Sequence, residues 1–267
     1  MRAGFRRLIL GEESDSWDRT VLPNDVRVRR DASGLRVSPG DGVRRRAAMV
    51  WFHGGGYVFG SPDTHLRPAA RLAQRSGREV RLPAYPLAPE SRWPAQLELA
   101  LEVIRSHDVP PILVGDSAGG HLALVAALFL RREGRELPGL ILFSPNTDRS
   151  GANECRASLS AGDPMVDDAD DQRLFKMAVG EDFDPRDPQM SPLLDDLSGL
   201  PPTWIDVGGS EVLRDDSVLL QRRAGLAGAS VSLRVIDGLL HMGQLWSPWW
   251  EPANESIDRM AEATEGL

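Results

Sequence analysis

The pattern of polar and apolar positions predicts a series of strands and helices. Polar and apolar residues alternate over 25–29 and again over 35–37, which predicts two half-exposed strands joined by a turn at 31–34. Short apolar runs predict further strands over residues 47–52, 79–82, 111–114, 140–143, 203–207 and 231–236. Segments of helical length lie between them, at 63–75, 95–106, 118–130, 214–225 and 254–265. This alternation predicts an α/β fold, with a mostly parallel sheet covered by helices on both faces.

Residues 150–194 interrupt the alternation of strands and helices. Acidic residues and prolines are frequent there, apolar runs are missing, and one helix is expected over 168–179. We therefore expect an insertion that lies over the core. Residues 1–20 are polar and weakly patterned, as in a short helix or arm. The predicted division is a core of residues 21–149 and 196–267, with a small cap formed by 1–20 and 150–195.

Composition narrows the range of partners. The 267-residue chain has a formal net charge of −8, which disfavours nucleic acids and anionic membranes as partners because both would repel it. A single cysteine, Cys155, excludes an internal disulfide framework and is expected to be a packed or idle thiol. The apolar run near the N-terminus, residues 8–10, is too short for a signal-peptide core, and no run elsewhere approaches the roughly 20 residues of a membrane span. We expect a cytoplasmic protein that acts on a small neutral molecule.

The stretch Gly-Asp-Ser-Ala-Gly at residues 115–119 is the clearest chemical signal in the chain. It lies directly between the predicted strand 111–114 and the predicted helix 118–130. A serine between two glycines at such a corner is typical of a nucleophile elbow, in which the serine is pushed out into the open. The glycines are needed because a Cβ at either position would collide with the neighbouring strand or helix. Ser117 is the predicted nucleophile.

A serine nucleophile needs a base, and His241 is the candidate. It follows the strand 231–236 on a loop at the carboxyl edge of the sheet, the edge at which Ser117 also lies and where sites of open α/β sheets gather. The other four histidines are interpreted as taking no part in catalysis. We expect His65 and His107 to be solvated surface residues, His121 to pack in the core or at its rim, and His53 to make a structural hydrogen bond.

The acid that orients the base is expected between the serine and the histidine, the order found in enzymes built around such an elbow. Glu211 is the first acid beyond the strand 203–207 and is favoured. Asp215 is the alternative, although it falls in the first turn of the next helix, where acids favour the helix dipole without any catalytic role. Asp206 lies inside the strand and is less well placed.

Three glycines in succession follow the strand 47–52 and predict an oxyanion hole. A loop without side chains can approach a ligand closely with its backbone, at a cost in conformational entropy. We expect the N–H groups of Gly55 and Gly56, together with that of Ala118 after the nucleophile, to bind the oxyanion. One such donor contributes a factor of about 10² to 10³ in rate.

Together these motifs resemble the bacterial hormone-sensitive-lipase-like (family IV) carboxylesterases in order and spacing. The resemblance covers roughly residues 46–265 and implies an α/β-hydrolase fold, a cap, hydrolysis of short-chain esters, and neither metal nor cofactor. Members of that family have Asp or Glu at the position of Glu211. The matching stretches are His-Gly-Gly-Gly-Tyr at 53–57, Gly-Asp-Ser-Ala-Gly-Gly at 115–120, Glu-Val-Leu-Arg-Asp-Asp at 211–216, and His241.

The chain also departs from the family pattern. Only 52 residues precede His53, fewer than is usual, so the pocket roof is expected to be more open or differently built. The loop 84–90 lacks the Asp and Arg that family members often carry, which affects loop support rather than chemistry. We expect Tyr57 and Trp246 to contact substrate. Trp246, Trp249 and Trp250 either line the pocket or pack an interface, and a homodimer is kept open.

The predicted function is that of a serine carboxylesterase acting through an acyl-enzyme. A specialised biosynthetic deacetylase or lactonase is the alternative. A non-catalytic ligand-binding relative, similar to plant hormone receptors of this fold, is disfavoured because His241 is present.

Overall fold

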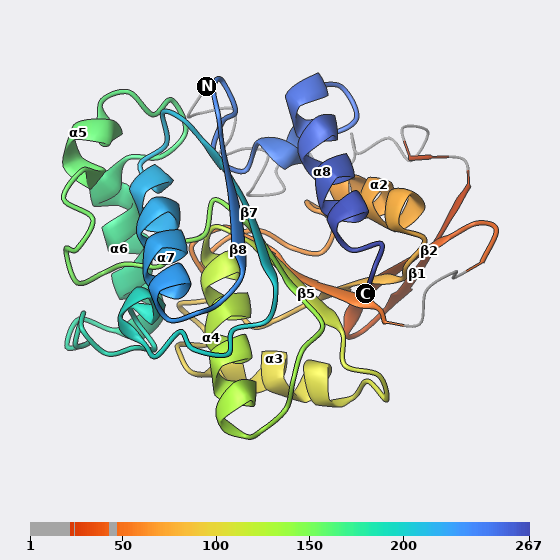
Figure 1. Ribbon diagram of the computed structural model, residues 1–267, viewed down its shortest axis with the longest axis horizontal. Coiled ribbons are helices and arrows are strands. Elements are labelled where there is room, and N and C mark those ends of the chain that lie inside the picture. The colour runs from red at the N-terminus through yellow and green to blue at the C-terminus, as the bar shows by residue number, and fades with distance from the viewer. Residues whose placement is uncertain (1–21, 24, 43–46) are drawn as a thin grey trace.

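The computed structural model describes residues 22–23, 25–42 and 47–267, and these form a single mixed sheet with helices on both faces (Figure 1). The sheet has eight strands in the order β1-β2-β4-β3-β5-β6-β7-β8. Strand β2 runs antiparallel to its neighbours β1 and β4, and every other pair is parallel. The strands are β1 (Val26–Asp31), β2 (Gly34–Pro39), β3 (Met49–Phe52), β4 (Val80–Pro83), β5 (Ile112–Asp116), β6 (Leu140–Phe143), β7 (Thr203–Gly208) and β8 (Val231–Ile236).

Helices cover the two faces of the sheet in separate layers. Helices α3 (Ala95–Arg105), α4 (Ala118–Arg132) and α7 (Arg214–Leu226) pack into one apolar cluster, while α2 (Leu66–Ser76) and α8 (Glu251–Ala263) pack into a second. Figure 1 shows α2 and α8 on one side of the strands and α3, α4 and α7 on the other. The predicted mostly parallel sheet between two helical layers is confirmed.

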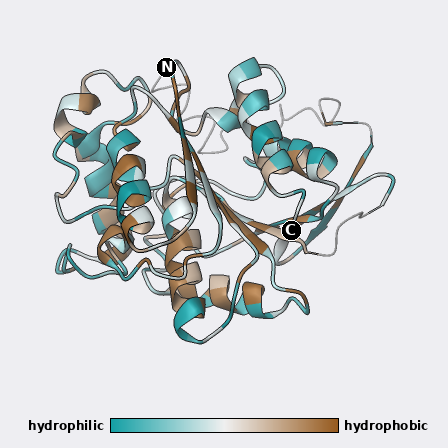
Figure 2. Ribbon diagram, in the orientation of Figure 1, coloured by the Kyte–Doolittle hydropathy of each residue, from teal (hydrophilic) through white to brown (hydrophobic). Residues whose placement is uncertain are grey.

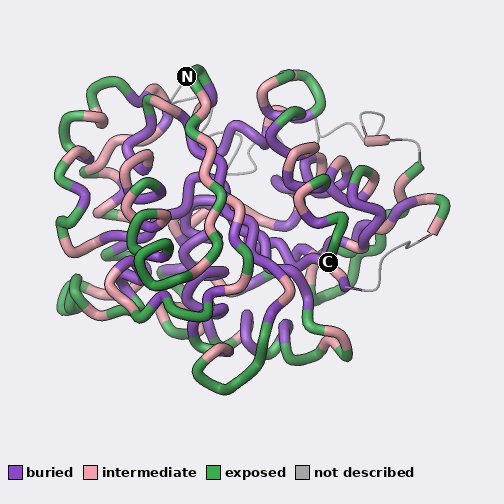
Figure 3. Tube along the Cα trace, viewed as in Figure 1, coloured by how far each residue is buried: buried purple, intermediate pink, exposed green. Residues whose placement is uncertain are grey.

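Burial of the central strands explains why their sequences are apolar throughout. All residues of β3, β5 and β6 are buried, because helices lie on both faces of the sheet at these strands. The hydrophobic ribbon in the middle of Figure 2 coincides with the buried tube in Figure 3. Strand β1 is more exposed than the half-exposed strand that the alternation predicted, because residues 27–31 are all exposed at the edge of the sheet. In β2, buried and more exposed positions alternate as predicted.

The insertion contains two α-helices, α5 (Arg156–Ser160) and α6 (Asp168–Val179), and a 3-10 helix, η3 (Pro192–Leu194). The bounds of α6 match the prediction, and Asp167 caps it by accepting hydrogen bonds from the N–H groups of Ala169 and Asp170. Helix α5 was not predicted. Buried Arg156 connects the insertion to the core, since its guanidinium lies 3.3 Å from Asp216 and also pairs with Asp168 and Asp171.

The predicted arm at residues 1–20 lies outside the described residues. Among the helices that the structure describes, none combines the length and the apolar character needed to cross a membrane.

Candidate active site

The predicted elbow is a sharp turn between β5 and α4. Ser117 lies there with φ 52° and ψ −118°, a backbone conformation that residues with a side chain seldom adopt. A Cβ on Gly115 would lie 2.2 Å from the carbonyl oxygen of Gly119, and a Cβ on Gly119 would lie 2.0 Å from that of Phe52. Both glycines are therefore required by steric contact, as the sequence predicted.

The structure brings Ser117, His241 and Glu211 together in one hydrogen-bonded chain. Nε2 of His241 lies 3.0 Å from Oγ of Ser117, and Nδ1 lies 2.8 Å from Oε2 of Glu211. Because Nδ1 faces a carboxylate, it donates the proton there, which leaves Nε2 free to accept from the serine hydroxyl. Ser117, His241 and Glu211 are 7 %, 3 % and 2 % exposed, so their hydrogen bonds are held away from bulk water.

The register of the parallel strands explains why these residues meet. Gly115 pairs with Phe52, Asp116 with Phe143, and Phe143 with Asp206, so β3, β5, β6 and β7 end at the same edge. The segments that follow these strands carry the oxyanion loop, the elbow, Ser144 and the Glu211 loop. His241 joins them from the loop after β8, which pairs with β7 up to Ile236.

Glu211 is the acid that reaches the imidazole. Its second oxygen, Oε1, accepts hydrogen bonds from Oγ of Ser144 at 2.8 Å and from N–H of Gly208 at 2.6 Å. Asp215 instead lies 2.6 Å from the guanidinium of Arg214 on the first turn of α7. Asp206 is buried in β7, as predicted, and its carboxylate binds arginines. The geometry thus places Glu211, and not Asp215, next to His241.

The environment of His241 sets its protonation. Burial lowers its pKa by disfavouring the imidazolium, but the hydrogen bond and the charge of Glu211 act in the opposite direction. The net result is a pKa of His241 above its ordinary value of 6.5. A raised pKa makes the imidazole a better proton acceptor, which suits a general base.

The glycine loop after β3 presents backbone donors. Gly55 has φ 118° and Gly56 has φ 64°, both in the left-handed region that favours glycine. The carbonyl oxygen of Gly55 accepts from the N–H groups of Val58 and Phe59. Among the described residues, the N–H groups of Gly55, Gly56 and Ala118 have no hydrogen-bond acceptor. The three groups predicted to bind an oxyanion are therefore free to do so.

The two predicted substrate contacts differ in their surroundings. Tyr57 is 1 % exposed, and its hydroxyl lies 2.6 Å from Nδ1 of His121. Trp246 is half-buried and packs against the small apolar cluster of Met242 and Leu245. Trp249 is exposed and lies under the guanidinium of Arg67. A substrate-binding role for Tyr57 and Trp246 stays a prediction.

The remaining histidines support the fold, with one correction. Nδ1 of His53 lies 2.8 Å from the carbonyl oxygen of Gly54, and His121 is 1 % exposed, as expected for structural residues. The expectation that His65 is a solvated surface residue is wrong, because it is 1 % exposed and its Nε2 lies 3.1 Å from the carboxylate of Asp116. His107 is half-buried rather than fully solvated.

Sequence reasoning missed two polar residues that hold the site. Ser144 follows a buried apolar strand, and Asp116 lies inside the elbow motif, so both had a visible signal: a polar residue at the carboxyl end of a central strand. The partners of each residue lie far away in the chain. Trp51 and His65 contact Asp116 from 65 and 51 positions away, and Ser144 contacts Glu211 from 67 positions away.

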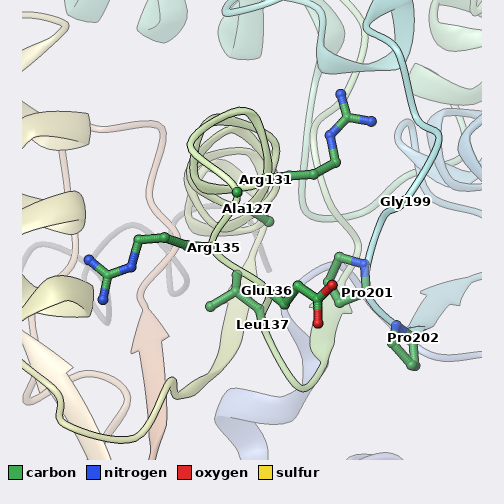
Figure 4. Close-up of a pocket in the computed structure, with 9 residues that line it drawn as sticks. Ala127, Arg131, Arg135, Glu136, Leu137, Gly199, Pro201 and Pro202 are labelled. Atoms are coloured by element: carbon green, nitrogen blue, oxygen red, sulfur yellow. The ribbon is translucent and has the colours of Figure 1, made fainter.

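A pocket of about 360 Å³ lies at the C-terminal end of α4, and its lining differs in chemistry from the site around Ser117 (Figure 4). It is lined by residues such as Ala127, Leu137 and Pro201, and no serine, cysteine or histidine lines it. In Figure 4 the side chains of Arg131 and Arg135 extend to opposite sides. Ala127 is the lining residue nearest to the elbow along α4, and it lies about 14 Å along the helix from Ala118. In the part of the chain that the structure describes, no cluster of His, Cys, Asp and Glu could hold a metal ion.

Comparisons with known proteins agree with this geometry. The model of the α/β hydrolase fold family matches residues 49–245. An esterase of Acinetobacter venetianus is 34 % identical over 92 % of this chain and 85 % of its own length. An acetyl-hydrolase of Streptomyces hygroscopicus is 35 % identical over 79 % of this chain and 72 % of its own.

Solved structures extend the comparison to three dimensions. The crystal structure of an esterase from the bacterial hormone-sensitive lipase family superposes with a TM-score of 0.84 at 32 % identity, covering 92 % of this chain and 86 % of that one. The residues that the family model matches, 49–245, include Ser117, Glu211 and His241. The chain belongs to the α/β-hydrolase family, within its bacterial hormone-sensitive-lipase group.

Proposed function

We propose that the protein is a serine carboxylesterase that hydrolyses short-chain carboxylic esters through an acyl-enzyme. One observation carries the proposal: the hydrogen-bonded chain from Ser117 through His241 to Glu211 lies at the sheet edge where Gly55 and Gly56 keep unpaired N–H groups. A nucleophile, a base, an orienting acid and oxyanion donors are the parts that acyl transfer requires.

The proposed reaction starts with attack of Ser117 Oγ on the ester carbonyl carbon. Nε2 of His241 takes the hydroxyl proton, and the carbonyl electrons move to the oxygen, which the N–H groups of Gly55, Gly56 and Ala118 bind. His241 then gives that proton to the leaving alcohol as the tetrahedral intermediate collapses to the acyl-enzyme. Water repeats the sequence, and the acid is released. Glu211 holds the imidazole and stabilises its cation throughout.

We also propose that residues 150–195 act as a cap over this site. A Cβ added to Gly56 would lie 3.1 Å from Cβ of Leu174, a residue of α6. Helix α6 therefore packs directly onto the proposed oxyanion loop. Such a contact would let the insertion shape the space in which the acyl or alcohol group binds. The predicted cytoplasmic location and a homodimer stay predictions.

The relatives support ester hydrolysis and suggest a second candidate. Proteins named esterase and ethyl acetate hydrolase are similar to this chain over most of its length, at 34 % and 31 % identity. The relative from Streptomyces hygroscopicus is named an acetyl-hydrolase. Removal of an acetyl group from a larger metabolite is therefore the second candidate, with the same serine chemistry and a different leaving group.

The test is a comparison of the wild-type protein with Ser117→Ala on p-nitrophenyl esters from acetate to decanoate. Loss of the nucleophile lowers kcat by about 10⁶ in a serine hydrolase, so the variant should be inactive. Ser158→Ala, at an exposed serine of α5, is the matched control and should keep wild-type activity. A Ser117→Ala protein that keeps more than a few per cent of activity would refute the mechanism. Activity confined to acetylated substrates would favour the second candidate.

A further inference from the structure

A second buried carboxylate–imidazole pair lies beside the proposed nucleophile and takes no part in the proposed reaction. Asp116, the residue before Ser117, is 2 % exposed and His65 is 1 % exposed. Nε2 of His65 lies 3.1 Å from Oδ2 of Asp116 and 3.0 Å from Oδ1. Removing ionisable groups from water costs free energy even when they are paired, so this pair needs a structural or functional reason.

The carboxylate of Asp116 joins the elbow to the glycine loop. Its Oδ2 accepts a hydrogen bond of 3.0 Å from N–H of Gly54, the residue immediately before Gly55. Its Oδ1 accepts 2.8 Å from Nε1 of Trp51, on the strand that leads into the loop. One side chain thereby holds both ends of the turn from β3 into the loop.

The contact between Asp116 and Gly54 is possible only because residue 54 has no side chain. A Cβ on Gly54 would lie 2.3 Å from Oδ2 of Asp116. Gly55 and Gly56 both have positive φ, and glycine has wide backbone freedom, so the loop needs an external anchor to hold its N–H groups in one direction. Asp116 provides that anchor at the residue preceding the donors.

His65 fixes the anchor in turn. Its ring packs edge-on against Trp51, with ring centroids 5.9 Å apart, and its Nδ1 lies 2.8 Å from Oγ1 of Thr64. The imidazole therefore has a partner on each nitrogen and presents Nε2 to the carboxylate. This arrangement resembles the one between Glu211 and His241, but with the roles reversed: here the imidazole orients the acid.

We propose that Asp116 and His65 are positioning residues that hold the N–H groups of Gly55 and Gly56 in the direction of the oxyanion. The inference rests on the proposed function and deepens it. Because an oxyanion forms only during the reaction, misdirected donors lower kcat and leave KM nearly unchanged. Complete loss of one donor costs about 10² to 10³ in rate, so displacement of the loop should cost about 10- to 100-fold.

The first experiment is Asp116→Asn with a matched control, Asp206→Asn. Both residues are buried carboxylates near the ends of central strands, but Asp206 binds Arg234, Arg259 and Ser256 instead of the glycine loop. Both variants should lower the melting temperature. Asp116→Asn alone should lower kcat by 10- to 100-fold, while Asp206→Asn should stay within about threefold of wild type. Equal kcat values in the two variants would overturn the inference.

A thionoester substrate separates the oxyanion donors from the nucleophile. Sulfur in place of the carbonyl oxygen is a weaker hydrogen-bond acceptor, so an intact oxyanion hole favours the oxygen ester. In Asp116→Asn the ratio of kcat/KM for the ester to that for its thionoester should fall below the wild-type ratio. If Ser117 or His241 is displaced instead, both substrates lose rate equally and the ratio is unchanged, which would refute a role through the loop.

A pair of His65 variants keeps the inference testable if Asp116→Asn does not fold. His65→Gln retains an N–H donor at the reach of Nε2, whereas His65→Leu removes it. The glutamine variant should keep kcat and the ester-to-thionoester ratio near wild type, and the leucine variant should lose both. Equal values in the two variants refute the inference. The proposed function is tested separately, by ester hydrolysis in the wild-type protein and in Ser117→Ala. If the wild type is active and Ser117→Ala is not, equal His65 variants refute only the role of His65 and Asp116. An inactive wild type would refute both that role and the proposed function.

Discussion

Oγ of Ser144 donates a hydrogen bond of 2.8 Å to Oε1 of Glu211 from the neighbouring strand end. Ser144 is fully buried. Its φ of 46° is seldom adopted by residues other than glycine, so the backbone is strained at the residue that makes this hydrogen bond. With Gly208 N–H as its second donor, Oε1 is fully occupied and only Oε2 faces His241. Glu211 is thereby held in one orientation towards the imidazole.

The first prediction concerns the identity of the acid. Glu211→Gln should lower kcat by about 10³ to 10⁴, because the amide cannot stabilise the imidazolium and can impose the wrong tautomer. Asp215→Asn weakens a partly exposed ion pair with Arg214 and a hydrogen bond with the thiol of Cys155, neither of which contacts His241, and should leave kcat within about twofold of wild type. Steady-state kinetics of the two variants on one ester decide the matter. Inactivity of Asp215→Asn alone would show that Asp215 is the acid.

The second prediction concerns the hydroxyl of Ser144. Ser144→Ala leaves Oε1 of Glu211 with a single donor, and a buried hydrogen bond to a charged group contributes about 1.5–3 kcal/mol to stability. We expect a loss of this size in the free energy of unfolding, measured by urea denaturation, together with a lower kcat. Ser76→Ala is the matched control: the buried hydroxyl of Ser76 donates to the carbonyl oxygen of Leu72 within α2, so this variant should keep wild-type kcat. A wild-type kcat in Ser144→Ala as well would mean that this hydroxyl does not orient the acid.

The third prediction concerns pH. Only neutral His241 can accept the proton of Ser117, so kcat/KM should fall as pH decreases through the pKa of His241, at a midpoint above 6.5. In Glu211→Gln burial remains while the charge of Glu211 is lost, and the midpoint of the residual activity should move to lower pH. A midpoint that does not move would mean that Glu211 does not set the pKa.

The raised pKa of His241 also affects stability. Protonation of His241 is more favourable in the folded than in the unfolded protein, so it adds stability that is complete below the unfolded pKa of about 6.5. This contribution is lost as pH rises through the folded-state pKa. The difference in unfolding free energy between wild type and Glu211→Gln should therefore shrink across that range.

The fourth prediction concerns the glycines of the elbow. Gly115→Ala places a Cβ 2.2 Å from the backbone of Gly119, and neither strand nor helix can move away easily. We expect a loss of about 3 kcal/mol in the free energy of unfolding and loss of activity. Gly225→Ala is the matched control, because residue 225 lies on α7 with open space around it, and it should stabilise by about 0.5 kcal/mol. Similar melting temperatures for the two variants would contradict the steric argument.

Much of the fold could be predicted because its signals are local. The bounds of α6 and β8 match the sequence prediction, and the buried strands were found from continuous apolar runs. The short α5 was missed, since its five residues carry no apolar periodicity and are held in place by contacts of Arg156 with distant acids. His65 was misplaced for a related reason: it lies in a polar stretch, and its burial comes from Trp51 and Asp116.

The sequence by itself determined the nucleophile elbow, the order of Ser117, an acid and His241, and the glycine loop, because each depends on residue type and spacing near a strand end. Only the tertiary structure decided which acid meets His241 and which side chains hold the two loops. Those choices depend on strand register, which brings Ser144 to Glu211 and Asp116 to Gly54 across more than 60 positions of the chain. Hydrogen bonds between such distant residues leave no periodic pattern in the sequence.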